Sequence, residues 1–153
     1  MSTKSSRQVP FAYEPLDMSA DTIRLLKILP SSSDDAPICC EIRNTTFKSE
    51  KYNCVSYTWL PANPRHKILL NDNTVTVGDN LYQFLKAARR AGKIEDLWID
   101  ALCINQTDDV EKSHQVHRMG KIYRGADQTL IWLGSLTEEL RCCLETLVAL
   151  AWE

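Results

Sequence analysis

The pattern of hydrophobic and polar residues in the first half of the chain is typical of short β-strands. Residues 22–29 ("TIRLLKIL") and 38–44 ("ICCEIRN") predict two strands, and the polar, proline-bounded stretch between them predicts a hairpin. Residues 52–59 ("YNCVSYTW") predict a third strand, which the two prolines of "LPANP" end. Residues 67–77 predict a second hairpin, because Asn71-Asp72-Asn73 forms a turn whose residues tolerate positive φ.

Helices alternate with strands in the second half. Residues 80–91 predict a helix with one apolar face, made by Leu81, Phe84, Leu85 and Ala88. Asn80 and Gln83 fit its N-cap and N3 positions, and Gly92 fits the position just after its end. A strand is expected at 96–104, a second helix at about 109–124, a strand at 129–134 and then a final helix. The second helix has one apolar face, made by Val116, Met119, Ile122 and Tyr123. The apolar face of the final helix is made by Leu136, Leu140, Leu144 and Leu147.

This order of elements predicts an α/β fold. Strands that alternate with helices favour a mostly parallel sheet flanked by helices, with the hairpins added at its edge. The strands near 52–57, 97–102 and 129–133 are the most continuously apolar, so we expect them to be central, with Trp98 and Trp132 in the core. Residues 1–20 have no pattern and predict a flexible lead-in, and residues 21–153 predict a single domain.

Composition narrows the class of partner. The 153 residues are 44% hydrophobic and 25% charged, as in an ordinary soluble domain with one core. Eighteen Lys and Arg against twenty Asp and Glu give a formal net charge of -2, which argues against a nucleic-acid or anionic membrane surface. The beginning of the chain has no signal-peptide pattern, and its longest apolar run is too short to cross a bilayer, so we expect a cytoplasmic protein. Its six cysteines are then expected to be free thiols, with Cys54 and Cys103 buried.

Hydrogen-bonding residues gather where two predicted strands end. Ser56, Tyr57 and Trp59 close one strand, and Asp100, Asn105 and Gln106 follow Leu97-Trp98-Ile99 in the other. The carboxyl ends of parallel strands are where α/β folds bind ligands, so these six residues predict a substrate site. Each of them taken alone is also explained by helix capping or by a loop contact.

The helix at 109–124 adds Glu111, Gln115 and Arg118, which form a polar strip bordering its apolar face. Glu111 suits the helix dipole, and it is equally well placed to hold a ligand's hydroxyl groups. His114 and His117 are spaced as a metal pair, but they fall on the solvent side without further ligands, so we predict no metal site. The phosphate-binding glycine loops of known kinds are absent.

Three blocks of the sequence resemble the fungal heterokaryon-incompatibility (HET) domain. They are "YNCVSYTW", "LWIDALCINQTDDVEKSHQVHRMGKIYRGA" and "LIWLG", in the family's order, and the resemblance covers about residues 50–135. One departure is that Leu60 and Pro61 follow Trp59, where the first block usually continues with glycine.

The resemblance implies a module of fungal self/non-self recognition that triggers cell death. HET domains are considered similar to Toll/interleukin-1 receptor-type (TIR) domains, which have a flavodoxin-like fold and of which some cleave NAD with a helical glutamate. This more distant likeness makes Glu111 the candidate catalytic residue and NAD the candidate substrate, with no cofactor. Under it, Trp59 or Tyr57 stacks on a ring, while Asn105, Gln106 and Arg118 bind hydroxyls or phosphates.

Two other interpretations remain open. The domain is alternatively a non-enzymatic signalling module that works by homotypic assembly or by contact with other signalling domains. A third alternative is a fragment, because the chain stops at "LVALAWE" without a helix stop signal and members of the family are commonly larger.

Overall fold

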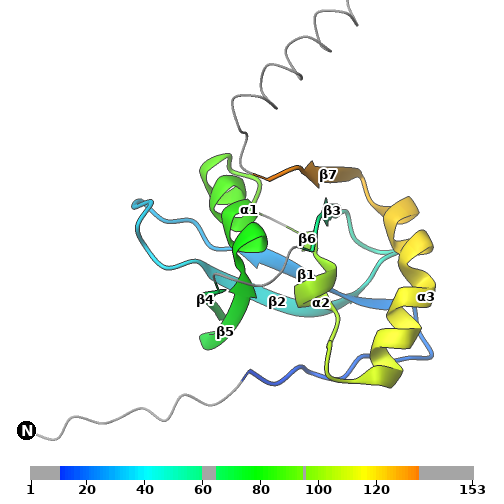
Figure 1. Cartoon of the computed structure of the whole chain (residues 1–153). Helices are drawn as coiled ribbons and strands as arrows, with labels where there is room; N and C mark the ends of the chain where they lie inside the picture. The colour runs from blue at the N-terminus through cyan, green and yellow to red at the C-terminus, as the bar shows by residue number, and fades with distance from the viewer. Residues whose placement is uncertain (1–10, 60–64, 95, 135–153) are drawn as a thin grey trace, which may run out of the picture.

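A computed structural model describes residues 11–59, 65–94 and 96–134 (Figure 1). These residues form seven strands and three helices, in the order β1 (Thr22–Ile28), β2 (Cys39–Thr46), β3 (Asn53–Tyr57), β4 (Arg65–Leu70), β5 (Asn73–Gly78), α1 (Asp79–Arg90), β6 (Leu97–Trp98), α2 (Asp100–Cys103), α3 (Asp109–Gly125) and β7 (Gln128–Trp132). The α/β class predicted from the sequence is confirmed.

Both predicted hairpins form. β1 and β2 pair antiparallel from Thr22 opposite Thr46 to Ile28 opposite Cys40. β4 and β5 pair antiparallel around a two-residue loop, in which Asn71 and Asp72 have φ values of 45° and 62°. Two successive residues with positive φ make a type I′ turn, whose twist matches that of the flanking strands.

The seven strands form one mixed sheet in the order β5-β4-β2-β1-β6-β3-β7. Three strand pairs are antiparallel (β1/β2, β1/β6 and β4/β5) and three are parallel (β2/β4, β3/β6 and β3/β7). The prediction of a mostly parallel sheet is therefore wrong, and of the two hairpins expected at its edge only β4–β5 lies there. The β1–β2 hairpin lies in the middle of the sheet, where it connects the β4–β5 hairpin to the parallel strands β6, β3 and β7.

The strand predicted at 96–104 is much shorter. β6 contains only Leu97 and Trp98, and the chain then turns into the one-turn helix α2. The Asp100 carboxylate accepts the N–H of Ala101 at 2.7 Å, and the N–H groups of Leu102 and Cys103 donate to the Ile99 carbonyl. Leu102 and Cys103 are buried on one side of this turn, so their apolar character suited a helical turn as well as a strand.

Helix α1 ends as the sequence predicts but begins differently. Gly92 has a φ of 69°, and the N–H groups of Gly92 and Lys93 donate to the carbonyls of Arg89 and Ala88, which is a Schellman motif. The N-cap is Gly78, without a side-chain cap, so the prediction of Asn80 as N-cap is wrong. The Asn80 side chain instead bonds to groups outside the helix.

Helix α3 has an unexpected buried face. Asp108 caps its start by accepting the N–H groups of Val110 and Glu111 at 3.0 Å each. Its buried residues are Glu111, Gln115 and Ile122, whereas Val116 is 50% exposed. The prediction that Val116 lies on the core face is therefore wrong, because Glu111 and Gln115 are buried on the core side of the helix.

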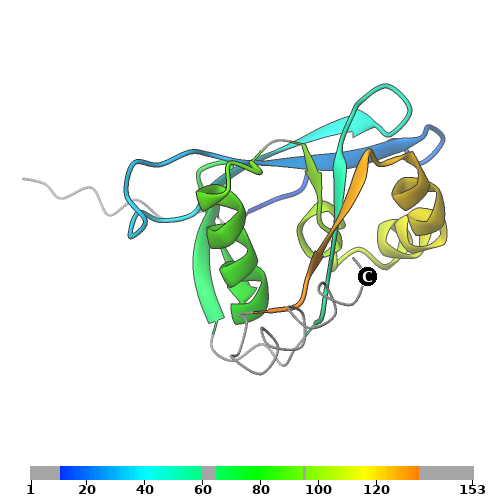
Figure 2. The same cartoon turned by 90° about the horizontal axis from the view of Figure 1, so that it is seen from above.

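Helices cover both sides of the parallel strands. Figure 2 shows α1 on one side of β3 and β7 and α3 on the other, with α2 between them. Trp98 is fully buried, as predicted, and Trp132 is half-buried against Phe84 of α1. β7 is the last strand of the described sheet and Ile131 is 70% exposed, so the prediction of a central position for this strand is wrong.

The remaining predictions concern the two ends of the chain, the cysteines and membrane spans. Residues 11–20 of the predicted lead-in pack on the domain, with Leu16 buried. The four described cysteines are free, and Cys54 and Cys103 are buried as predicted. The helix predicted from Leu136 onward lies outside the described residues. Within the described ranges, no helix is long and apolar enough to cross a membrane.

Candidate functional site

A pocket of about 230 Å³ lies at the carboxyl end of β3. Its lining comes from four parts of the chain: residues 57–59 after β3, residues 75–81 at the junction of β5 and α1, residues of the α2 region, and Tyr13 from the N-terminal segment. Three of the predicted site residues meet there, namely Tyr57, Trp59 and Gln106. The pocket therefore brings together residues that follow β3 and a residue that follows α2.

Two aromatic rings form one wall of the pocket. The rings of Tyr57 and Trp59 stack with centroids 6.4 Å apart and planes 18° apart. Trp59 is 58% exposed, which leaves much of the indole accessible to a second ring. Burial raises the pKa of Tyr57 well above its ordinary value, with smaller contributions from Asp100 and Tyr123, so its phenol stays neutral.

Asp100 supplies a carboxylate beside this aromatic wall. It lies at the start of α2, next to the pocket-lining residue Ala101, and is half-buried. Burial raises the pKa of Asp100, and hydrogen bonds from the Ala101 backbone and the Trp59 side chain oppose this rise. Gln106 donates its side-chain N–H to the Asp100 carbonyl at 3.0 Å, which ties the two ends of the α2 region together.

The beginning of α1 was missed as part of the site. Asn80 donates to the Thr58 carbonyl at 2.8 Å and accepts the indole N–H of Trp132 at 2.9 Å. It therefore ties α1 to the ends of β3 and β7. Asp79 faces His66, at 2.7 Å, and Gln83, at 3.1 Å. Asn80 was noticed in the sequence, but as a helix cap, and no local pattern shows which strand ends lie beside it.

Glu111 lies away from the aromatic pocket in a buried ion pair. Its two carboxylate oxygens accept the Nη1 and Nη2 groups of Arg24 at 2.5 and 3.0 Å, and Oε1 also accepts the N–H of Asn105 at 2.8 Å. Arg24 is 1% exposed and Glu111 is 5% exposed. Burial by itself raises the pKa of Glu111, but the hydrogen bonds from Arg24 and Asn105 and the charge of Arg24 lower it overall. A catalytic role for this carboxylate requires its pair with Arg24 to open.

The other predicted residues hold loops or face elsewhere. Gln115 donates to the Thr22 carbonyl at 3.1 Å, and Arg118 donates to the Ala20 carbonyl at 2.8 Å and pairs with Asp21. Asn105 lines a second pocket, of about 200 Å³, together with Glu111 and Tyr13. Ser56 precedes Tyr57 in β3, so its side chain points to the opposite face of the strand, and it is not among the residues that line the aromatic pocket.

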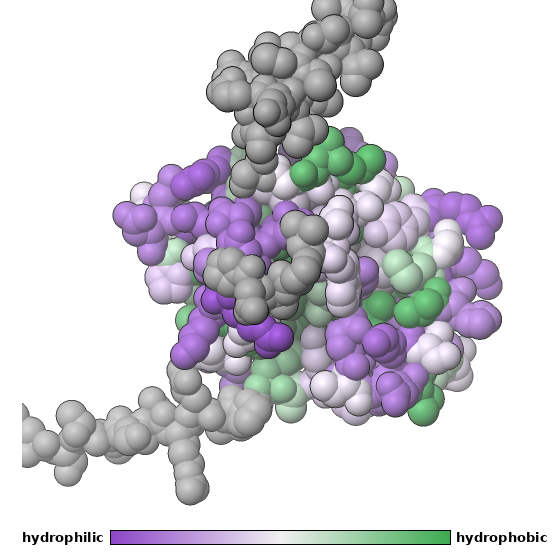
Figure 3. Space-filling view, viewed as in Figure 1, coloured by the Kyte–Doolittle hydropathy of each residue, from purple (hydrophilic) through white to green (hydrophobic). Residues whose placement is uncertain are grey.

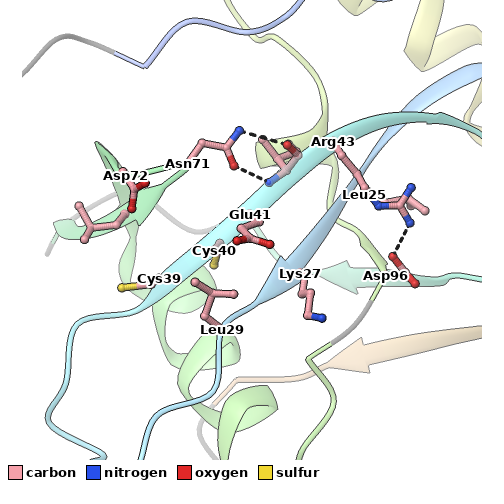
Figure 4. A pocket seen from close by; sticks show the side chains of 12 residues that line it. Leu25, Lys27, Leu29, Cys39, Cys40, Glu41, Arg43, Asn71, Asp72 and Asp96 are labelled. Atoms are coloured by element: carbon pink, nitrogen blue, oxygen red, sulfur yellow. Dashed lines mark hydrogen bonds and ion pairs between the residues drawn. The ribbon is translucent and has the colours of Figure 1, made fainter.

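A larger cavity of about 400 Å³ lies over β1, β2 and the β4–β5 turn (Figure 4). None of the predicted site residues lines it. Arg43 pairs there with Asp96 at 2.8 Å and with Glu50, and Asn71 bonds to both the N–H and the carbonyl of Ile42. The hydrogen-bonding groups of these residues are already paired with one another. We therefore consider the aromatic pocket the better candidate for a ligand site.

In the parts of the chain that the structure describes, no three His, Cys, Asp or Glu side chains come close enough together to hold a metal ion. His114 and His117 lie on α3, where His114 is half-buried and His117 is exposed.

Comparisons with known proteins identify the family of the chain. The heterokaryon incompatibility protein (HET) family matches residues 52–150, which include β3, α1, α2 and the pocket residues they carry. The chain is 30% identical over 160 aligned residues to heterokaryon incompatibility protein 6, OR allele, of Neurospora crassa. That alignment covers 94% of this chain and 23% of the relative, so the chain spans less than a quarter of that protein. No solved structure matches. On the family match, the chain belongs to the heterokaryon incompatibility (HET) family.

Proposed function

We propose that this HET domain acts in self/non-self recognition by binding NAD in the aromatic pocket and hydrolysing it. The observation that carries the proposal is the stacked pair of Tyr57 and the half-exposed Trp59 beside the carboxylates of Asp79 and Asp100. The nicotinamide ring of NAD is flat and positively charged, so it is attracted both to an indole face and to nearby carboxylates. The distant similarity of HET domains to TIR domains adds to this support but does not replace it.

We infer from the size of the pocket that it takes one end of NAD and not the whole dinucleotide. A cavity of about 230 Å³ is smaller than the roughly 300–1,000 Å³ of pockets that enclose a drug-sized ligand. It suits the nicotinamide ring and part of its ribose, while the rest of the dinucleotide lies outside. Gln106 lines the pocket, where its side-chain amide can bond to a ribose hydroxyl or to the nicotinamide amide.

The reaction is a hydrolysis of the bond between nicotinamide and ribose. Nicotinamide leaves with the electron pair of that bond and becomes neutral, water adds its oxygen to the ribose carbon, and one proton is released. The ribose passes through an oxocarbenium-like state, which a neighbouring carboxylate stabilises by charge. We assign this role to Asp100, because its carboxylate lies beside Trp59. The other predicted carboxylate, that of Glu111, is paired with Arg24.

Nicotinamide release from NAD by the purified protein tests the proposal, at protein concentrations high enough to force any assembly. We expect Asp100→Asn to lower kcat/KM roughly a hundredfold. Trp59→Ala should lower it roughly tenfold. Val116→Ala changes an exposed residue of α3 outside the pocket and is the matched control. The proposal is wrong if the wild-type protein releases no nicotinamide and NAD does not raise its melting temperature.

Homotypic assembly without catalysis is the second candidate function. It is favoured by β7, the last strand of the described sheet, where Ile131 is 70% and Leu133 is 60% exposed. Figure 3 shows a hydrophobic patch over this strand. Under this alternative, Ile131→Lys should abolish self-association and cell death, and Trp59→Ala should change neither.

A further inference from the structure

The N-terminal segment, residues 11–20, lies before the part of the chain that matches the HET family, yet it forms part of the pocket. Tyr13 donates its hydroxyl to the Leu102 carbonyl of α2 at 2.9 Å, and Asn44 of β2 donates to the Pro15 carbonyl at 3.1 Å. Leu16 is 8% exposed. The segment is therefore packed on the domain, and Tyr13 presents its ring to the aromatic pocket.

Arg24 connects this segment to the rest of the site. It is buried in β1 and donates to the Glu14 carbonyl at 2.7 Å and to the Cys103 carbonyl at 3.1 Å, in addition to its two bonds with Glu111. Its guanidinium carbon lies 4.6 Å from the centre of the Tyr13 ring, a cation–π distance. One side chain thus holds Tyr13, the end of α2 and the start of α3.

Glu111 extends the connection to a second residue that lines the pocket. Its Oε1 accepts the N–H of Asn105, the residue just before Gln106, which lines the pocket and bonds to Asp100. Charge-assisted bonds from a backbone N–H to a buried carboxylate fix a loop more firmly than neutral bonds do. Opening the pair of Arg24 and Glu111 therefore frees both Tyr13 and the loop of Gln106.

We propose that Tyr13 is a ligand-contacting wall of the NAD pocket and that the buried pair of Arg24 and Glu111 positions Tyr13 and Gln106 around it. The contact with ligand rests on the proposed function, whereas the positioning stands on the contacts alone. Glu111 then acts through other residues and does not touch the substrate.

The position of Tyr13 gives this proposal a specific consequence. Among the described residues, Tyr13 is the one that lines both the aromatic pocket and the 200 Å³ pocket that contains Glu111. Removing its side chain joins the two spaces and leaves the ligand ring without a wall on that side. Replacing Tyr13 by Phe keeps the wall and loses only the hydroxyl bond to Leu102.

Steady-state kinetics of nicotinamide release, with NAD as the probe, tests the wall. We expect Tyr13→Ala to raise KM for NAD roughly tenfold with kcat within about threefold of wild type, which corresponds to the loss of one aromatic contact. Tyr13→Phe keeps the ring and should restore most of the affinity lost in Tyr13→Ala. Val116→Ala, at an exposed residue outside the pocket, is the control and should leave KM unchanged. An unchanged KM in Tyr13→Ala overturns the wall. If the wild-type protein releases no nicotinamide, the proposed function and the ligand contact of Tyr13 fall together.

Hydrogen exchange of the protein without ligand tests the positioning independently. We expect Glu111→Gln to speed amide exchange both in residues 11–20 and at 105–106. Arg24→Lys keeps a charge for Glu111 but loses the fork that reaches Glu14, so it should speed exchange in residues 11–20 and leave 105–106 nearly unchanged. Glu50→Gln, which removes one partner of the exposed pair with Arg43, is the control and should change neither segment. Unchanged exchange in both segments of Glu111→Gln and Arg24→Lys overturns the positioning pair.

Discussion

For Glu111→Gln, the sequence and the structure predict different changes in the melting temperature. A glutamate in the first turn of a surface helix interacts mainly with the helix dipole, so its loss costs about 0.3–1 kcal/mol. That expectation follows from the sequence, and it predicts a nearly unchanged melting temperature. The structure changes the premise, because Glu111 is 5% exposed and faces Arg24, which is 1% exposed.

The magnitude follows from leaving Arg24 charged and buried without its counter-ion. Removing one partner of a buried ion pair costs about 3–5 kcal/mol. Gln keeps a side-chain carbonyl that can accept from Arg24 or Asn105, so we expect the lower end, about 3 kcal/mol. At about 2–4 °C per kcal/mol for a domain of this size, the melting temperature should fall by roughly 6–12 °C.

The pH dependence gives a second signature of the same pair. The pKa of Glu111 is lower in the folded protein than its ordinary value, mainly because Arg24 and Asn105 outweigh the effect of burial. A lowered pKa contributes stability that is fully present above the unfolded pKa, about 4.3, and is lost as pH falls through the folded pKa. The difference in stability between wild type and Glu111→Gln should therefore narrow as pH falls below about 4.

Urea unfolding followed by circular dichroism, at pH 7 and at several values down to pH 3.5, measures both effects. Glu50→Gln is the matched control, because Glu50 makes a two-bond pair with Arg43, at 3.2 and 3.1 Å, on the surface. Water screens that pair, so its loss should barely move the midpoint. If the two variants have the same midpoint at pH 7, the buried pair of Arg24 and Glu111 does not stabilise the fold more than the exposed pair does. If Glu111→Gln is strongly destabilised, its loss of activity no longer identifies Glu111 as catalytic.

Two further predictions concern glycines and thiols. A Cβ at Gly125 would lie 2.9 Å from the Tyr52 hydroxyl, so Gly125→Ala should destabilise by about 1–3 kcal/mol; Gly120→Ala on the same helix meets only a flexible arginine end at 3.8 Å and should stabilise by about 0.5–1 kcal/mol in the same urea assay. Burial raises the pKa of Cys40, Cys54 and Cys103 to about 12, so mass spectrometry after brief alkylation of the native protein should find Cys39 labelled well before these three. Equal labelling of Cys39 and Cys54 would contradict their assigned burial.

Local features of the fold were predictable because their causes lie within a few residues. The type I′ turn follows from Asn71 and Asp72, which tolerate positive φ, and the end of α1 follows from Gly92. The site's aromatic wall was also predictable, since Tyr57 and Trp59 stand at the end of an apolar strand. In each case the residues that decide the structure are neighbours in the chain.

Strand neighbours and the extent of β6 were decided by tertiary structure. Alternation of apolar and polar residues indicates a strand but does not identify the strand that pairs with it. The sequence of β1 therefore does not predict its antiparallel pairing with β6. Leu102 and Cys103 look like a continued strand, yet they fill the buried side of a single helical turn. Short apolar stretches leave this choice to the surrounding core.

Glu111 shows the same division at the candidate site. From its spacing, the sequence determined that Glu111 borders the apolar face of a helix, and this left a dipole contact and a ligand contact equally open. Its partner Arg24 lies 87 positions earlier in the chain, and Tyr13, which that arginine holds, lies in a segment without any periodic pattern. A buried charge needs a counter-charge, and only the folded structure identifies which arginine supplies it, because the pairing depends on how β1 and α3 pack and not on any local preference of either residue.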